Sequence, residues 1–115
     1  MLDFTTKEQL MARQAYIKVS ERRNNKDFDF DDYKSFALSF PALIHSCGLV
    51  QAVAFAEAKK KNNFLEDLQA VFKEIDNAGD LATRSREANI MEYMRISRRA
   101  ISAASWIKRY CQASK

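Results

Sequence analysis

Apolar residues recur at helical spacing along most of the chain. A first helix is predicted after the overlapping capping-box patterns in residues 5–9, and it should end at residues 22–25. A second should begin near Asp32 and end at Gly48. A kink or a break is expected at Pro41, because proline lacks an amide donor and restricts the residue before it. The first part of the chain therefore reads as two helices.

The middle of the chain predicts two further helices. Leu49–Ala58 is apolar almost all round, which indicates a helix buried at the centre of the fold. After a turn rich in lysine, apolar residues over 64–75 mark a fourth, amphipathic helix that should end near Gly79. A short segment, 80–85, then leads into the last helix.

The segment 90–111 carries two stripes of side chains on opposite sides of one long helix. At about 100° per residue, six mostly small residues fall close to one line and should face the core. They are Tyr93, Ser97, Ala100, Ala104, Ile107 and Cys111. The opposite side carries Arg95, Arg99, Ser102, Trp106 and Arg109, with Arg98 at its edge. Arginines interrupted by one indole form an unusual outer face, which makes this row the first candidate for a binding surface.

Composition supports an all-α fold. The 115 residues include only two Gly and one Pro, which leaves little material for hairpin turns. Hydrophobic residues make up 47% and charged residues 30%, as in ordinary folded proteins. We therefore expect residues 1–115 to form a single helical domain, a compact bundle of five to six helices with a long C-terminal helix.

The positive charge is concentrated in the last quarter of the chain. The net charge is +4, but residues 84–115 contain eight Lys or Arg and two acids, for +6, whereas the first 83 residues sum to −2. Such asymmetry favours a polyanion or an acidic protein as the partner. A solvated helix face with no partner would show the same pattern.

Residues suited to catalysis or metal binding are few. The only histidine, His45, lies two positions from Cys47, so on a helix the two side chains point in different directions. The aspartates of 27–32 lack the glycine and the glutamate of an EF-hand loop. No zinc spacing and no glycine-rich phosphate loop occur. We expect no enzyme activity, no cofactor and no metal.

The cysteines and the hydropathy pattern bear on where the protein works. Cys47 and Cys111 are far apart and follow no secretory signal, so we expect reduced thiols in a cytoplasmic protein. No apolar run approaches the length of a membrane span.

The arginine row allows two interpretations. Arginine pairs bidentately with phosphate, and Trp106 offers a ring on which an unpaired base can stack, so RNA backbone contact is one function. Alternatively, Trp106 anchors a protein partner whose acids meet the arginines, and the chain is a helical adaptor without nucleic-acid contact.

Two blocks of the sequence carry a family resemblance. The first runs from Tyr33-Lys34-Ser35 through Phe40-Pro41-Ala42-Leu43-Ile44 to Gly48-Leu49-Val50-Gln51-Ala52-Val53-Ala54-Phe55. The second runs from Glu92-Tyr93-Met94-Arg95 through Ser97-Arg98-Arg99-Ala100 to Trp106-Ile107-Lys108-Arg109-Tyr110. Together they resemble the small subunit of the type III-B CRISPR effector, the Cmr RNA-silencing complex.

That resemblance implies an all-helical, non-catalytic subunit in antiviral defence. Copies stack into an inner filament beside the backbone subunits that hold the guide RNA, and other subunits carry the cleavage activities. The implied partners are other Cmr subunits, further copies of the chain, and guide and target RNA; the isolated subunit is compatible with a monomer. From charge geometry, the RNA-binding candidates are Arg95, Arg98, Arg99, Trp106, Lys108, Arg109, Arg13, Lys18, Lys59, Lys60 and Lys61.

Overall fold

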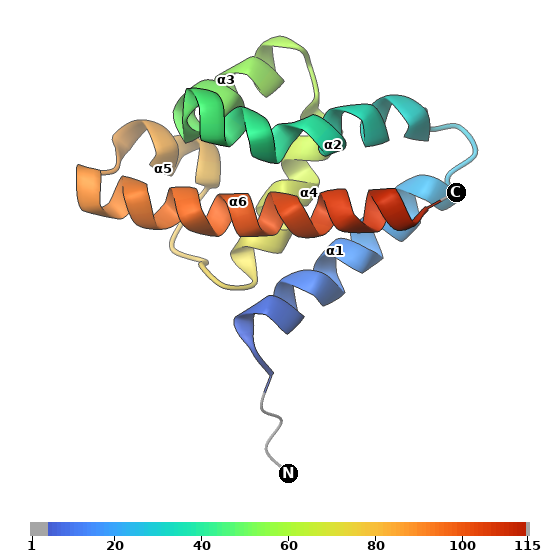
Figure 1. The fold of residues 1–115 in the computed structure, drawn as a ribbon, viewed down its shortest axis with the longest axis horizontal. Coiled ribbons are helices and arrows are strands. Elements are labelled where there is room, and N and C mark those ends of the chain that lie inside the picture. Colours follow the sequence, from blue (N-terminus) through green and yellow to red (C-terminus); the bar gives the residue numbers. More distant parts are fainter. Residues whose placement is uncertain (1–4, 115) are drawn as a thin grey trace.

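The computed structural model describes residues 5–114, and it folds this range into six helices (Figure 1). They are α1 (Lys7–Asn24), α2 (Phe30–Cys47), α3 (Leu49–Ala58), α4 (Asn62–Lys73), α5 (Leu81–Glu87) and α6 (Ile90–Ala113). No strand occurs within this range, so the all-α prediction is confirmed. None of the helices in it is both long enough and apolar enough to span a bilayer.

Short polar side chains set the starts of four helices. Thr6 forms the capping box of α1: its hydroxyl accepts from the Gln9 amide, while the Gln9 side chain accepts from the Thr6 amide. Asp29, Asp80 and Asn89 cap α2, α5 and α6 in the same way, each accepting from an amide three residues on. These bonds satisfy amides that have no partner inside the helix. The local sequence therefore determines where these four helices begin.

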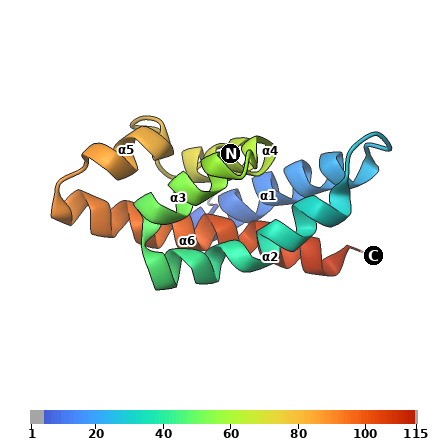
Figure 2. The ribbon, with the colours of Figure 1, turned by 90° about the horizontal axis from the view of Figure 1, so that it is seen from above.

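The long helix α6 is the centre of the fold. It packs against α1, α2, α4 and α5, and Figure 2 shows α2 and α6 along one side with α4 and α5 along the other. The predicted inner stripe is largely correct, because Ala100, Ala104, Ile107 and Cys111 are fully buried while Tyr93 and Ser97 are half-buried. Ile96 and Ala103 complete the buried face. The small side chains let neighbouring helices approach α6 closely.

The prediction for α3 is wrong. This helix packs against α2, α4 and α5, and it buries Leu49, Ala52, Val53 and Ala56 on one face only. Its other face, which includes Phe55, is exposed. An all-apolar sequence does not fix which side of a helix meets the core, and a ten-residue helix at the margin can leave apolar groups in solvent.

Of the kink or break expected at Pro41, the break is wrong. Helix α2 continues from Phe30 through Pro41 to Cys47, and Pro41 is buried. Only one helical hydrogen bond is lost at proline, and the buried neighbours Phe40 and Ile44 pack into the core on either side. Tertiary packing therefore outweighs the local preference.

A buried polar contact links three helices away from the arginine row. The carboxylate of Asp67 on α4 accepts from the Tyr33 hydroxyl of α2 at 2.5 Å and from the Arg22 guanidinium of α1 at 3.0 Å and 3.1 Å. Burial, reinforced by the charge of Asp67, raises the pKa of Tyr33 well above its usual value. The hydroxyl therefore stays protonated and donates to the carboxylate.

Candidate nucleic-acid interface

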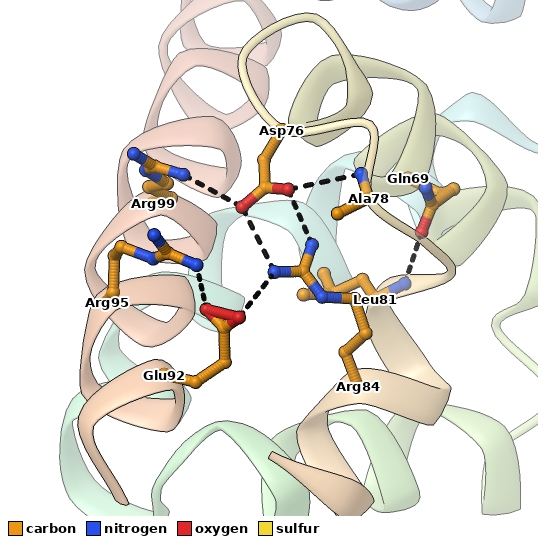
Figure 3. A network of polar contacts seen from close by, with 8 residues as sticks. All are labelled: Gln69, Asp76, Ala78, Leu81, Arg84, Glu92, Arg95 and Arg99. Carbon is orange, nitrogen blue, oxygen red and sulfur yellow. Dashed lines mark hydrogen bonds and ion pairs between the residues drawn. The ribbon is translucent and has the colours of Figure 1, made fainter. Parts of the chain in front are cut away.

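The N-terminal half of α6 joins a network of ionic contacts, which we call the Asp76 cluster (Figure 3). It comprises Asp76, Arg84, Glu92, Arg95 and Arg99. Asp76, in the connection after α4, accepts from the two terminal nitrogens of Arg84 at 2.6 Å and 3.2 Å. It also accepts from Arg99 at 2.8 Å. The cluster thus ties α6 to α5 and to the end of α4.

Glu92 extends the cluster along α6. Its carboxylate pairs with Arg84 at 3.3 Å and with Arg95, three residues further along the helix. The hydrogen bond from Arg95, with the charge of Arg84, holds the pKa of Glu92 below its usual value. Glu92 is therefore ionised at neutral pH.

The charges of the Asp76 cluster stabilise one another. Burial opposes ionisation of Asp76, but hydrogen bonds from Arg84, from the Ala78 amide and from Arg99 outweigh it and hold its pKa below the usual value. The hydrogen bond to Asp76 in turn raises the pKa of Arg84. Three arginines of the basic C-terminal region are thus paired with two acids of the protein itself. The arginines are Arg84, Arg95 and Arg99, and the acids are Asp76 and Glu92.

These ion pairs leave two of the predicted RNA-binding residues, Arg95 and Arg99, available to RNA to different degrees. The Arg99 side chain is only 26% exposed and is held by a buried carboxylate, whereas that of Arg95 is 49% exposed. A surface pair such as Arg95–Glu92 is worth little and exchanges partners easily. Arg95 can therefore exchange Glu92 for another anion at little cost, whereas Arg99 contributes to the fold through its bond to Asp76.

The C-terminal half of α6 faces α1. The Trp106 Nε1–H donates to Glu8 Oε1 at 2.7 Å, across 98 positions of sequence. Tyr110 stacks on Trp106 with ring centroids 6.0 Å apart, and the exposed Tyr16 of α1 meets Tyr110 edge-on at 5.5 Å. Trp106 is half-buried, so its ring is neither sealed in the core nor fully free.

Three basic residues of α6 keep their charge available. Within residues 5–114, Arg98, Lys108 and Arg109 form no ion pair. Arg98 and Arg109 are exposed and Lys108 is half-buried. Arg98 and Arg109 lie roughly 20° apart around the helix and roughly 16 Å apart along it. We call the exposed side of α6 that they bracket the outer face.

The other predicted basic residues lie on other elements. Arg13 and Lys18 belong to α1, where Arg13 is exposed and Lys18 lies 3.9 Å from Glu21. Lys59, Lys60 and Lys61 form the turn between α3 and α4, which α2 separates from α6 in Figure 1. Lys61 pairs with Asp32 at 2.8 Å. The structure therefore does not bring the lysine turn together with the arginines of α6.

The residues considered for catalysis show no assembled site. His45 and Cys47 are both exposed in the last turn of α2. Cys111 is buried, and that burial raises the pKa of its thiol to about 11. Across residues 5–114, no group of three or more His, Cys, Asp or Glu side chains is placed to hold a metal ion.

An apolar surface lies at the start of α6. Ile90, Met91 and Met94 are 69%, 76% and 51% exposed. Met94 lies three positions after Met91 and four after Ile90, so it neighbours both on the helix surface, and flexible methionines are favoured at protein-binding surfaces. Sequence reasoning missed this patch because it followed only the arginine row.

Comparison with known proteins identifies the family. The model of the family described as CRISPR-associated protein (Cas_Cmr5) matches residues 7–114. A curated Thermus thermophilus protein, CRISPR system Cmr subunit Cmr5, is 35% identical over 111 residues, covering 94% of this chain and 95% of that protein.

A solved structure agrees with the sequence match. The crystal structure of a CRISPR-associated Cmr5 family protein from Thermus thermophilus matches with a TM-score of 0.84 at 34% identity. The match covers 96% of this chain and 97% of that one. The resemblance found in the two sequence blocks is thus confirmed, and the chain belongs to the Cmr5 family of CRISPR-associated proteins.

Proposed function

We propose that the protein is a non-catalytic small subunit of a type III-B CRISPR effector complex in antiviral defence, and that the outer face of α6 contacts the backbone of guide or target RNA. Membership of the Cmr5 family supports the first part, since a relative is named as a Cmr subunit. One observation carries the second part: Arg98 and Arg109 are exposed and lack a carboxylate partner within residues 5–114.

Backbone contact is the mode of RNA binding that these side chains suit. Guanidinium groups pair bidentately with phosphate oxygens, and such contacts position a nucleic acid without reading its sequence. Arg98 and Arg109 are the leading candidates, and Lys108 and Arg95 flank them. Arg99 ranks last on α6, because binding phosphate would require it to leave Asp76.

Contact by a single copy is expected to be weak. Two or three exposed cations bring only modest affinity, and that affinity falls as salt rises. A row of stacked copies would add such contacts along one RNA and multiply the overall affinity. The proposal is therefore best tested in the assembled complex.

The test compares two double variants with the same loss of charge. Arg98→Ala with Arg109→Ala should weaken binding of target RNA, and it should flatten the plot of log affinity against log salt by about 0.7 to 0.9 per lost contact. The control is Lys73→Ala with Arg86→Ala, two exposed residues outside α6. Circular dichroism of each variant checks that the helices are retained.

An unchanged affinity and salt slope for the α6 variant would overturn the RNA part of the proposal. Equal weakening by both variants would show that total charge, rather than the outer face, determines binding. The family membership stands in either case, and a helical adaptor without RNA contact becomes the better account.

The apolar surface of Ile90, Met91 and Met94 supports contacts with other subunits or copies of the chain. We propose that it is buried when the complex assembles, since exposed apolar residues that gather on one face mark interaction sites. Met91→Glu should reduce incorporation of the subunit, measured by co-purification, without changing the thermal stability of the isolated chain. Normal incorporation would rule out this surface as an interface.

A further inference from the structure

A shallow depression lies on the outer face of α6 beside Trp106. Its volume is about 230 Å³, and we call it the Trp106 depression. The lining residues are Glu8, Ile101, Ser102, Ser105, Trp106 and Arg109. It thus combines an aromatic ring, an aliphatic wall, two hydroxyls, a carboxylate and a guanidinium in a small space.

The two charged groups of the depression do not neutralise each other. Glu8 and Arg109 form no ion pair, although both line it. Glu8 uses Oε1 to accept from Trp106, and no other residue of the described range donates to its Oε2. The site therefore offers one anionic acceptor fixed at the edge of the indole, and one cation a short distance away.

Trp106 lines the depression, whereas the tyrosine stacked on its ring does not. Tyr110, one turn after Trp106, stacks on the ring at an interplanar angle of 26° but does not line the depression. Ser102, one turn before Trp106, and Ile101 do line it. The ring face that Tyr110 covers is consequently not part of the depression.

We propose that the Trp106 depression is a subsite for a guanine base of single-stranded RNA. The base stacks on the open side of Trp106, Glu8 accepts hydrogen bonds from its N1–H and its exocyclic amine, and Arg109 pairs with an adjacent phosphate. This inference rests on the proposed function, and it adds a preference for one base to a surface that otherwise contacts only backbone.

The negative charge of Glu8 is the reason for a base rather than a phosphate at this point. A carboxylate repels phosphate but accepts strong, charge-assisted hydrogen bonds. Guanine presents two adjacent donors on its Watson–Crick edge, and both can donate to Glu8 Oε2, to which no other residue of the described range donates. Adenine and cytosine present one donor beside an acceptor, and uracil presents one donor between two carbonyls, so each brings an oxygen or a nitrogen lone pair against Glu8.

The experiment uses the full chain and the fluorescence of Trp106, its only tryptophan. At low salt and about 0.1 mM protein, near the weak end of non-specific binding, it is titrated with three RNAs. These are a uridine dodecamer, the same RNA with one central guanosine, and one with inosine at that position, which lacks the exocyclic amine. The guanosine RNA should bind about fivefold or more tightly than the uridine RNA, as one bidentate base contact provides, with inosine between them.

Two variants of equal charge isolate the role of Glu8. Glu8→Gln should abolish the guanosine preference, because an amide offers one acceptor and one donor in place of two acceptors. Glu21→Gln changes the net charge equally at an exposed position of α1, and it should keep the preference. Both should bind the uridine RNA alike.

Each remaining outcome overturns the inference. Equal binding of the guanosine and uridine RNAs removes the subsite but leaves the proposed backbone contact, which the salt slope of the assembled complex tests separately. A guanosine preference that survives Glu8→Gln removes Glu8 as the reader of the base. Failure of all three RNAs to bind the full chain also overturns it, and a Glu8→Gln variant that then fails to co-purify with the complex would mark the depression as a protein contact.

Discussion

The two halves of α6 carry the same kind of residue and use it differently. In the N-terminal half, Arg95 and Arg99 contact Glu92 and Asp76, and the side chain of Asp76 is almost completely buried. In the C-terminal half, Arg109 is exposed beside a depression and pairs with no acid of the described chain. Through Arg99 and Asp76 the N-terminal half fastens the helix to its neighbours, and of its arginines only Arg98 stays without an acidic partner in the described range. The C-terminal half leaves the charge of Arg109 at the surface.

This difference depends on what other segments bring to each half. A helical wheel places Arg99 and Arg109 on the same broad side of α6, and nothing in the helix itself separates them. The connection after α4 supplies Asp76 to one end, while α1 supplies Glu8 to the other, where Glu8 meets Trp106 instead of an arginine. The arginines of α6 therefore cannot be treated as one binding surface.

The largest effect is expected from removing the acid of the Asp76 cluster. Asp76→Ala leaves Arg84 and Arg99 without their shared carboxylate, and loss of one partner of a largely buried ion pair should lower the free energy of unfolding by about 3 kcal/mol. Urea denaturation measures it. Glu8→Ala, at the exposed contact with Trp106, should cost less than about 1 kcal/mol. Equal costs would contradict the contrast between the two halves.

A smaller effect should distinguish neighbouring arginines. Arg99→Ala removes a charge-assisted hydrogen bond to Asp76, although Arg84 remains, so about 1 to 2 kcal/mol of stability should be lost. Arg98→Ala, one position earlier and exposed, should change stability by no more than about 0.5 kcal/mol. If thermal and chemical denaturation cannot tell the two variants apart, the cluster does not stabilise the fold.

Local sequence signals predicted the framework of the protein well. The capping box at Thr6, the turn at Gly48 and the inner stripe of Ala100, Ala104 and Ile107 are all present. Each of these depends on residues a few positions apart, which is the range over which helix caps and helical periodicity act. The six helices of the described range lie within the expected five to six, although α5 was expected only as a short segment.

The candidate site could be predicted only in part, because its decisive contacts are long-range. Asp76 lies 23 positions from Arg99, and Glu8 lies 98 from Trp106, so no spacing rule connects them. Of the acids in the site, only Glu92 could have been anticipated, since it stands three residues before Arg95 on one helix. The exposed side of α3 was missed because an apolar sequence does not show which side lacks a neighbour.

Acid pH should lower the stability of the protein through protonation of Asp76. The folded-state pKa of Asp76 lies below its unfolded value of about 3.9, so its contribution to stability is complete above that pH and is lost as the pH falls through the folded pKa. The protein should therefore lose more stability below about pH 4 than the Asp76→Asn variant, in urea titrations at a series of pH values. Parallel curves would show that Asp76 is not stabilised as a carboxylate.

The central claim is that RNA meets the outer face of α6, between Arg98 and Arg109, and cross-linking in the unmodified complex tests it most directly. Target RNA carrying 4-thiouridine is irradiated in the assembled complex, and mass spectrometry locates the cross-linked peptides. We expect cross-links on the segment that includes Trp106 and Tyr110. Cross-links confined to the turn of Lys59, Lys60 and Lys61, or none on this subunit, would contradict the account.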